Sequence, residues 1–259
     1  MLQKNYWTMP KIKRIDGEQR FYEIDGVKYP SVTTVLNVVN KPAIGFWYRK
    51  EALLEVERNW ETLASKLTAG VHIEDALKEI TALAKSKPDE ILQEALDIGS
   101  EVHKHLEFIT KKWIATGKMQ VGGLVVSTEA VDNCLQAFYH WAEMHKFQPI
   151  ESELTVYSKK LGYAGTLDAI GKVDGKLAVV DYKSSKACYP EMGMQLSAYR
   201  HAYAEMRGER KVDEMWILRL GKNDGEFEAV RYNAPAKQML GFKGALKLWK
   251  WKQEMTTKK

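Results

Sequence analysis

Hydrophobic spacing changes character near residue 147. Before that point, apolar residues recur every three or four positions, as on one face of a helix. This pattern predicts helices over residues 43–116, with breaks near Gly70 and Lys87-Pro88, where glycine and proline interrupt the helical pattern. A further helix is expected over residues 127–146, opened by Ser127. The first half of the chain is therefore expected to be mostly helical.

A short extended segment precedes these helices. Residues 20–29 alternate around an Asp-Gly pair, which predicts a small β-hairpin. Ser31 follows directly, and its hydroxyl suits the N-cap of a helix that continues through TTVLNVV. The hairpin and this helix form the expected start of the fold.

Strand-like segments dominate after residue 147. Alternation and β-branched residues predict strands, and helical periods return between and after them. The expected order is three strands (151–158, 163–173, 176–183), a helix (190–206), two strands (212–220, 226–232) and a helix (235–254). The expected fold is therefore α/β (α+β), a central mixed sheet flanked by helices with a helical N-terminal region. We divide it into residues 1–146, hairpin and helices, and residues 147–259, the core with a basic C-terminal helix.

Strand register brings acidic side chains together. Asp174-Gly175 is a strong two-residue hairpin signal, and with it as the loop, Asp168 lies directly opposite Asp181. Lys183 emerges on the same face, because side chains alternate along a strand. A second register, with residues 159–162 as the loop, adds Glu153 to the row opposite Asp168. The sequence thus predicts three carboxylates and a lysine on one face of the sheet.

This cluster suits metal-assisted hydrolysis. Like charges on facing strands repel, whereas a divalent cation between them converts repulsion into coordination. A metal held by carboxylates activates water and relieves charge when a phosphodiester is hydrolysed. Lys183 can stabilise the developing charge or position the water. Burial would lower the pKa of this lysine, whereas a neighbouring carboxylate would raise it. The sequence alone does not decide whether the pKa of Lys183 is raised or lowered.

Positive charge gathers at the C-terminal end of the 259-residue chain, whose net charge is +5. From Asn233 onward there are seven lysines and one acidic residue, Glu254. Lys250 and Trp249 stand in this stretch beside Trp251. Basic and aromatic side chains together suit a nucleic-acid backbone and its bases. A solvated helix whose tryptophans pack on the core fits the same pattern, so both interpretations stay open.

Other features of the composition restrict the class of protein. Hydrophobic residues make up 45% of the chain, enough for a folded core. No apolar run approaches the ~20 residues that span a bilayer, and the first residues lack the apolar stretch of a signal peptide. Cys134 and Cys188 are far apart and match no zinc or iron–sulfur spacing. We therefore expect a cytoplasmic protein that has no membrane partner and binds no iron–sulfur cluster.

The motifs GTLDAIG and VVDYKSS resemble the aspartate strand and the (D/E)XK strand of the PD-(D/E)XK nuclease superfamily. Further segments resemble its RecB-like, Cas4-like group, with phage exonucleases and the mitochondrial genome maintenance exonuclease as the closest members. IGSEVHKHLE is similar to that group's histidine helix, MQLSAY to its Q-x-x-x-Y helix, and YPSVTTVLNVVNKP to its opening segment. The resemblance runs from about Tyr29 to Tyr203 and implies a restriction-endonuclease-like core.

The resemblance also implies residue roles. His103, Asp168, Asp181 and the backbone carbonyl of Tyr182 are expected to bind Mg²⁺ or Mn²⁺. The same resemblance implies that Lys183 is catalytic and that Gln195 and Tyr199 hold this lysine or contact DNA phosphate. With Glu153 added from strand register, catalytic roles are expected for five residues: Asp168, Asp181, Lys183, Glu153 and Gln195. With the basic, aromatic C-terminal stretch added, six residues are expected to contact the substrate: Gln195, Tyr199, Ser31, Thr33, Lys250 and Trp249. Relatives with an iron–sulfur cluster use four cysteines for it, and this chain has two.

Three functions fit these patterns. The first is a metal-dependent DNA exonuclease acting on single-stranded or duplex ends in recombination, replication or repair, of phage or prophage type and with a possible protein partner. The second is a structure-specific or sequence-specific endonuclease on the same core. The third is a catalytically inactive DNA-binding module, which fits least because every expected catalytic position is filled. Fold alone does not choose among them.

Overall fold

The computed structural model describes residues 10–123, 125–208 and 211–257. The first nine residues, for which no signal peptide is expected, lie outside the described residues, as do Lys258 and Lys259 of the basic stretch. Spatial clustering gives two compact units. One contains the described residues up to Val39 and from Val102 onward, and the other is Asn40–Glu101. The boundary expected at residue 147 therefore does not coincide with the boundaries of the two compact units.

The larger unit is built on a five-stranded mixed sheet. Its strands are β4 (Gln148–Ser158), β5 (Tyr163–Val173), β6 (Lys176–Lys183), β7 (Glu214–Leu220) and β8 (Phe227–Arg231), hydrogen-bonded in that order. Only β6 and β7 run parallel, because α6 (Pro190–Met206) connects them as a crossover. The bounds of β5, β6 and α6 are those that the hydrophobic pattern predicted, whereas β4 begins three residues earlier than expected and β7 and β8 are shorter. The expected mixed sheet flanked by helices is confirmed.

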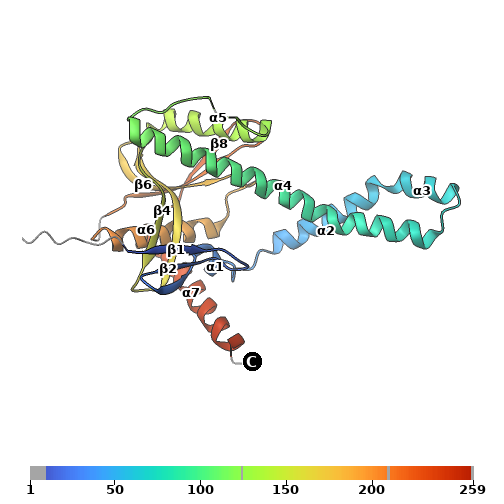
Figure 1. The fold of residues 1–259 in the computed structure, drawn as a ribbon, viewed down its shortest axis with the longest axis horizontal. Helices are drawn as coiled ribbons and strands as arrows, with labels where there is room; N and C mark the ends of the chain where they lie inside the picture. Colours follow the sequence, from blue (N-terminus) through green and yellow to red (C-terminus); the bar gives the residue numbers. More distant parts are fainter. Residues whose placement is uncertain (1–9, 124, 209–210, 258–259) are drawn as a thin grey trace, which may run out of the picture. The chain divides into compact units, whose positions relative to one another are not determined.

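Helices cover both faces of this sheet (Figure 1). On one face lie α6, α1 (Val32–Leu36) and α7 (Pro235–Thr257), whose apolar side chains share a core with the sheet. On the other lie α5 (Glu129–Met144) and the second half of α4 (Ile73–Thr116). The side chains of Val102, Leu106 and Ile109 on α4 are buried. This burial fixes the stretch of α4 that carries His103.

A three-stranded sheet holds the N-terminal part of this unit. The expected hairpin is β2 (Phe21–Ile24) with β3 (Val27–Pro30), and β1 (Ile12–Ile15) adds a third strand. The sequence did not predict β1, because three of its four residues are exposed and no apolar alternation marks them. Ser31 caps α1 as expected, since its hydroxyl accepts a hydrogen bond from the backbone N–H of Thr34 at 2.9 Å.

The smaller unit is helical. It contains α2 (Pro42–Arg58), α3 (Trp60–Thr68) and the first part of α4, with Leu63, Ala76 and Ile80 at its centre. The expected break near Gly70 is confirmed, because α3 ends before it and Gly70 has a φ of +83°. Among the described residues, no helix has the length and apolar character to cross a bilayer.

Several expected helix limits are wrong: α1 ends at Leu36 rather than Val39, and α7 continues past residue 254 to Thr257. Pro88 lies inside α4 and does not break it. A proline within a helix costs about 3 kcal/mol, but Ile80, Ala84 and Pro88 recur at intervals of four and are all buried, so packing of this face keeps the helix continuous. The helix expected from Ser127 begins later, because Thr128 is the N-cap and its side chain accepts from the backbone N–H of Val131.

Candidate metal and catalytic site

The β5–β6 hairpin has the predicted register. Asp174 and Gly175 form the turn with φ values of +50° and +81°, as a tight turn of this kind requires. The ladder then runs in register from Val173 opposite Lys176 to Ala169 opposite Val180. Asp168 and Asp181 come at the next step. There the Asp168 Oδ2 atom accepts a hydrogen bond of 2.7 Å from the backbone N–H of Tyr182. The two aspartates are thus brought side by side.

The second predicted register brings in Glu153. Ser152 pairs with Ala169 and Leu154 pairs with Leu167, so Glu153 lies opposite Asp168 as expected. Its backbone is left-handed, with a φ of +51°. A non-glycine residue in this conformation costs about 1–3 kcal/mol, and such strain often marks functional positions. The strained backbone of Glu153 is therefore maintained by the surrounding sheet at the point where its carboxylate meets Asp168.

Helix α4 supplies the third member of the cluster. The His103 Nδ1 atom lies 3.5 Å from the Asp168 Oδ1 atom. One ligand atom each from His103, Glu153 and Asp168 lie within 4.8 Å of one another. Two carboxylates and an imidazole nitrogen at this spacing fit a divalent cation, since carboxylate oxygen suits Mg²⁺ and Mn²⁺. We call these three residues the metal cluster.

The charges in the metal cluster are coupled. The negative charge of Asp168 is the largest influence on His103 and raises its pKa to about 9. Burial opposes ionisation of Asp168, but His103, Lys183 and the Tyr182 backbone N–H together keep the pKa of Asp168 below its usual value. Burial, and then the charge of Asp168, raises the pKa of Glu153 to about 7. Without a cation, a proton on His103 therefore balances the charge of Asp168.

Asp181 is held by other side chains. Its Oδ2 atom pairs with the Lys183 ammonium, and its Oδ1 atom accepts a hydrogen bond of 3.1 Å from Gln195. The side chain is almost fully buried, and this burial raises its pKa to about 6. The ligand atoms that lie close enough together to share one cation thus belong to His103, Glu153 and Asp168, and not to Asp181. Asp181 and the carbonyl of Tyr182 stay predicted ligands.

The pKa of Lys183 is raised. Burial alone would lower it, but attraction to Asp181 and Asp168 is stronger in sum. Of the two directions left open by the sequence, the geometry thus favours the charged ammonium. A protonated lysine at this position suits stabilisation of negative charge rather than removal of a proton from water.

Helix α6 carries the Gln195 and Tyr199 pair on one face. Gln195 Nε2 donates both to Asp181 and, at 3.1 Å, to the Tyr199 hydroxyl. Tyr199 is buried and packs closely over Gly165 on β5, where an added Cβ would lie 2.6 Å from the tyrosine ring. These contacts connect α6 to the aspartate strand. Gln195 therefore positions the carboxylate of Asp181.

Ser31 and Thr33 lie near this helix through α1. The Ser31 hydroxyl is buried and used in the helix cap and in hydrogen bonds to Thr33 and Thr34. Thr33 is exposed. Of these two predicted substrate contacts, Thr33 has the surface position.

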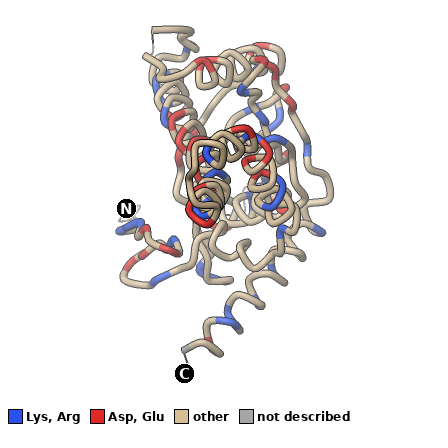
Figure 2. The backbone as a smooth tube through the Cα atoms, turned by 90° about the vertical axis from the view of Figure 1, so that its right-hand side faces the viewer, with Lys and Arg blue, Asp and Glu red and all other residues tan. Residues whose placement is uncertain are grey.

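The basic stretch forms α7, along which lysines are spread (Figure 2). Trp249 is partly buried against the core, its ring centroid 6.1 Å from that of Phe21. Its indole nitrogen is buried. Lys250 donates to the backbone carbonyl of Leu161 at 3.0 Å, whereas Trp251 is 56% exposed. The structure thus gives Trp249 the core-packing position that the sequence left as an alternative.

Sequence reasoning missed two charged residues beside the metal cluster. Glu107 and Lys111 both act on the pKa of Glu153, the first raising it and the second lowering it. Glu107 is four residues after His103, and residues at this interval share one face of a helix. That spacing was the signal in the sequence that could have identified Glu107.

Comparison with known families agrees with this geometry. The family model of the PD-(D/E)XK nuclease superfamily matches residues 34–250, a range that includes every residue of the metal cluster together with Asp181 and Lys183. A search among curated proteins found no match. The matched range is well over half of the chain, and the mixed sheet flanked by helices is consistent with a restriction-endonuclease-like core. The chain therefore belongs to the PD-(D/E)XK nuclease superfamily.

Proposed function

We propose that this protein is a Mg²⁺- or Mn²⁺-dependent exonuclease that hydrolyses DNA phosphodiesters from DNA ends. The observation that carries the proposal is the metal cluster of His103, Glu153 and Asp168 beside the Asp181–Lys183 ion pair. Superfamily membership supports a metal-dependent nuclease acting on DNA. The preference for ends rests on the resemblance of the histidine helix and the Q-x-x-x-Y helix to the RecB-like group, including its phage members.

Each side chain has a distinct part in the proposed chemistry. A bound divalent cation supplies a polarised phosphate oxygen and an activated water. His103, Glu153 and Asp168 would hold it, with Asp181 as a further ligand. The Lys183 ammonium lies next to Asp181 and stabilises the negative charge that builds up on the phosphate oxygens. Gln195 holds Asp181 in place through its amide. The Tyr182 backbone N–H does the same for Asp168.

Substrate topology tests the preference for ends. The protein is expected to shorten linear DNA progressively in Mn²⁺ and to leave a covalently closed supercoiled circle intact. The measurement is gel analysis of the two substrates mixed in one tube, so that metal and enzyme are the same for both. A circle nicked once before the reaction serves as a matched control that offers an end. Nicking of the closed circle at a rate close to that of linear DNA would contradict the exonuclease and favour the endonuclease.

Metal affinity is expected to rise with pH. Coordination requires deprotonated ligands, so the cation displaces protons from His103, whose pKa Asp168 raises to about 9, and from Glu153, whose pKa burial raises to about 7. One displaced proton makes binding about tenfold tighter per pH unit below its pKa. Calorimetric titration of Mn²⁺ between about pH 6 and pH 8 measures this slope. His103→Ala is expected to bind more weakly and with a shallower slope, and an affinity independent of pH in the wild type would contradict the ligand set.

A further inference from the structure

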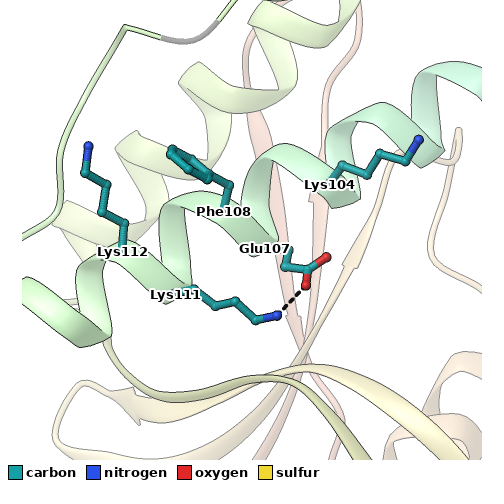
Figure 3. Close-up of a pocket in the computed structure, with 5 residues that line it drawn as sticks. All are labelled: Lys104, Glu107, Phe108, Lys111 and Lys112. Atoms are coloured by element: carbon teal, nitrogen blue, oxygen red, sulfur yellow. Dashed lines mark hydrogen bonds and ion pairs between the residues drawn. The ribbon is translucent and has the colours of Figure 1, made fainter. Parts of the chain in front are cut away.

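The surface of α4 immediately after His103 forms an open pocket. Its volume is about 440 Å³, and it is shallow and open to solvent. Figure 3 shows the five side chains that line it, all from α4: Lys104, Glu107, Phe108, Lys111 and Lys112. The pocket belongs to the same compact unit as the metal cluster. The residues assigned above to metal binding and catalysis do not include any of its lining.

This pocket continues from the metal cluster along the helix. Glu107 follows His103 by four residues and Lys111 follows Glu107 by four, so the three side chains form one row. Glu107 and Lys111 also lie close enough to act electrostatically on Glu153. Phe108 and Lys112 form the adjacent row, again four residues apart. The row of Glu107 and Lys111 therefore connects the pocket with the metal cluster.

The pocket combines positive charge with an exposed aromatic ring. Phe108 is 53% exposed, and the Lys112 Nζ atom lies 5.7 Å from the centre of its ring. The single acidic side chain, Glu107, is ion-paired with Lys111. Lys104 and Lys112 are eight positions apart, about 12 Å along the helix axis.

We propose that this face of α4 binds a single-stranded segment of the DNA substrate next to the phosphate that is cleaved. A base stacks on Phe108, and Lys104 and Lys112 contact the phosphates on either side. Unpaired strands offer the base faces that an exposed aromatic ring binds, whereas the bases of a duplex are already stacked. The inference rests on the proposed function only in taking DNA as the substrate. Beyond that function, we infer that the bound DNA is single-stranded and which residues bind it.

Binding of a short oligonucleotide tests this inference without cleavage. Fluorescence anisotropy with labelled oligothymidylate is measured in EDTA and again in Ca²⁺. Phe108→Ala and Phe108→Leu are both expected to weaken binding about 5- to 100-fold, and Phe108→Trp to retain it, because the stacking ring rather than apolar bulk is required. A half-exposed side chain can be replaced without loss of the core, and circular dichroism of each variant verifies folding.

Salt dependence tests the lysines separately. The double variant Lys104→Ala/Lys112→Ala keeps the Glu107–Lys111 ion pair intact, so no acidic charge is released. The slope of log affinity against log salt is expected to fall in magnitude by about 1.4, or 0.7 for each lost phosphate contact. Lys11→Ala/Lys13→Ala is the matched control. Both lysines are exposed at β1 in the N-terminal sheet, outside α4, so their loss removes the same charge without changing the pocket.

Two results would overturn the inference. One is wild-type affinity in Phe108→Ala, and the other is full affinity in Phe108→Leu, which would show that no base stacks on this ring. Cleavage of linear DNA by the wild type, measured alongside, separates this inference from the proposed function. If the wild type cleaves DNA but binding does not depend on Phe108, only the proposed single-strand site is contradicted. If binding depends on Phe108 but no metal supports cleavage, the nuclease activity is contradicted and the single-strand site is retained.

Discussion

Replacing Asp168 with asparagine is expected to abolish metal binding and, with it, DNA cleavage. Asp168 is the centre of the metal cluster, since its two oxygens contact His103 and the Tyr182 backbone N–H and it faces Glu153. Asparagine has nearly the same shape but no negative charge. Loss of a residue that only supports a ligand weakens metal binding about 10- to 100-fold, so loss of this ligand should exceed about 100-fold. Calorimetry with Mn²⁺ measures the affinity, and end-labelled DNA measures the rate.

The same variant has a spectroscopic signature. Asp168 is the main cause of the raised pKa of His103, so in Asp168→Asn that pKa should fall from about 9 toward its usual range. NMR titration of the metal-free protein follows this change independently of activity. Asp174→Asn is the matched control, because Asp174 lies in the turn of the same hairpin and contacts His145. Unchanged Mn²⁺ affinity in Asp168→Asn would remove Asp168 from the metal site.

Lys183→Met is expected to slow cleavage by a factor of about 10²–10³ or more while metal binding is retained. The methionine keeps the length of the side chain and removes the ammonium that stabilises charge in the transition state. Metal affinity should stay the same or increase, since a positive charge near the cluster is lost. Measuring the rate at saturating Mn²⁺ and the Mn²⁺ affinity on the same preparation separates the two effects.

Removal of this lysine also acts on Asp181. Burial already raises the pKa of Asp181 to about 6, and without its cationic partner the pKa should rise further. The activity that remains should therefore decline more steeply as the pH falls toward 6 than it does in the wild type. Lys176→Met, at the other end of β6, is the control for loss of a strand lysine. A Lys183→Met enzyme that keeps more than a tenth of the wild-type rate would exclude the ammonium from the chemistry.

Much of the sheet and its register followed from local sequence. The Asp174-Gly175 pair fixes the turn, the turn fixes the pairing of β5 with β6, and strand alternation then puts Lys183 beside Asp181. These relations depend on a few neighbouring residues and on backbone geometry that varies little. For that reason the strands and the row of acidic side chains could be predicted without any knowledge of the surrounding helices.

Features that depend on tertiary packing could not be predicted in this way. The left-handed backbone of Glu153 and the hydrogen bond from Gln195 to Asp181 arise when separate elements meet. The same holds for Pro88, whose position within a helix is maintained by a buried face, and for Trp249, whose ring packs on Phe21. Local propensity is a weak guide where burial decides the outcome.

We propose that the cluster of His103, Glu153 and Asp168 holds a cation that this protein needs to cut DNA. The most direct measurement incubates the wild type and Asp168→Asn with end-labelled linear DNA in Mg²⁺, in Mn²⁺ and in EDTA. We expect cleavage by the wild type in at least one of the two metals, none in EDTA, and none by Asp168→Asn in any condition. Cleavage by Asp168→Asn at the wild-type rate, or wild-type cleavage that persists in EDTA, would contradict the proposal.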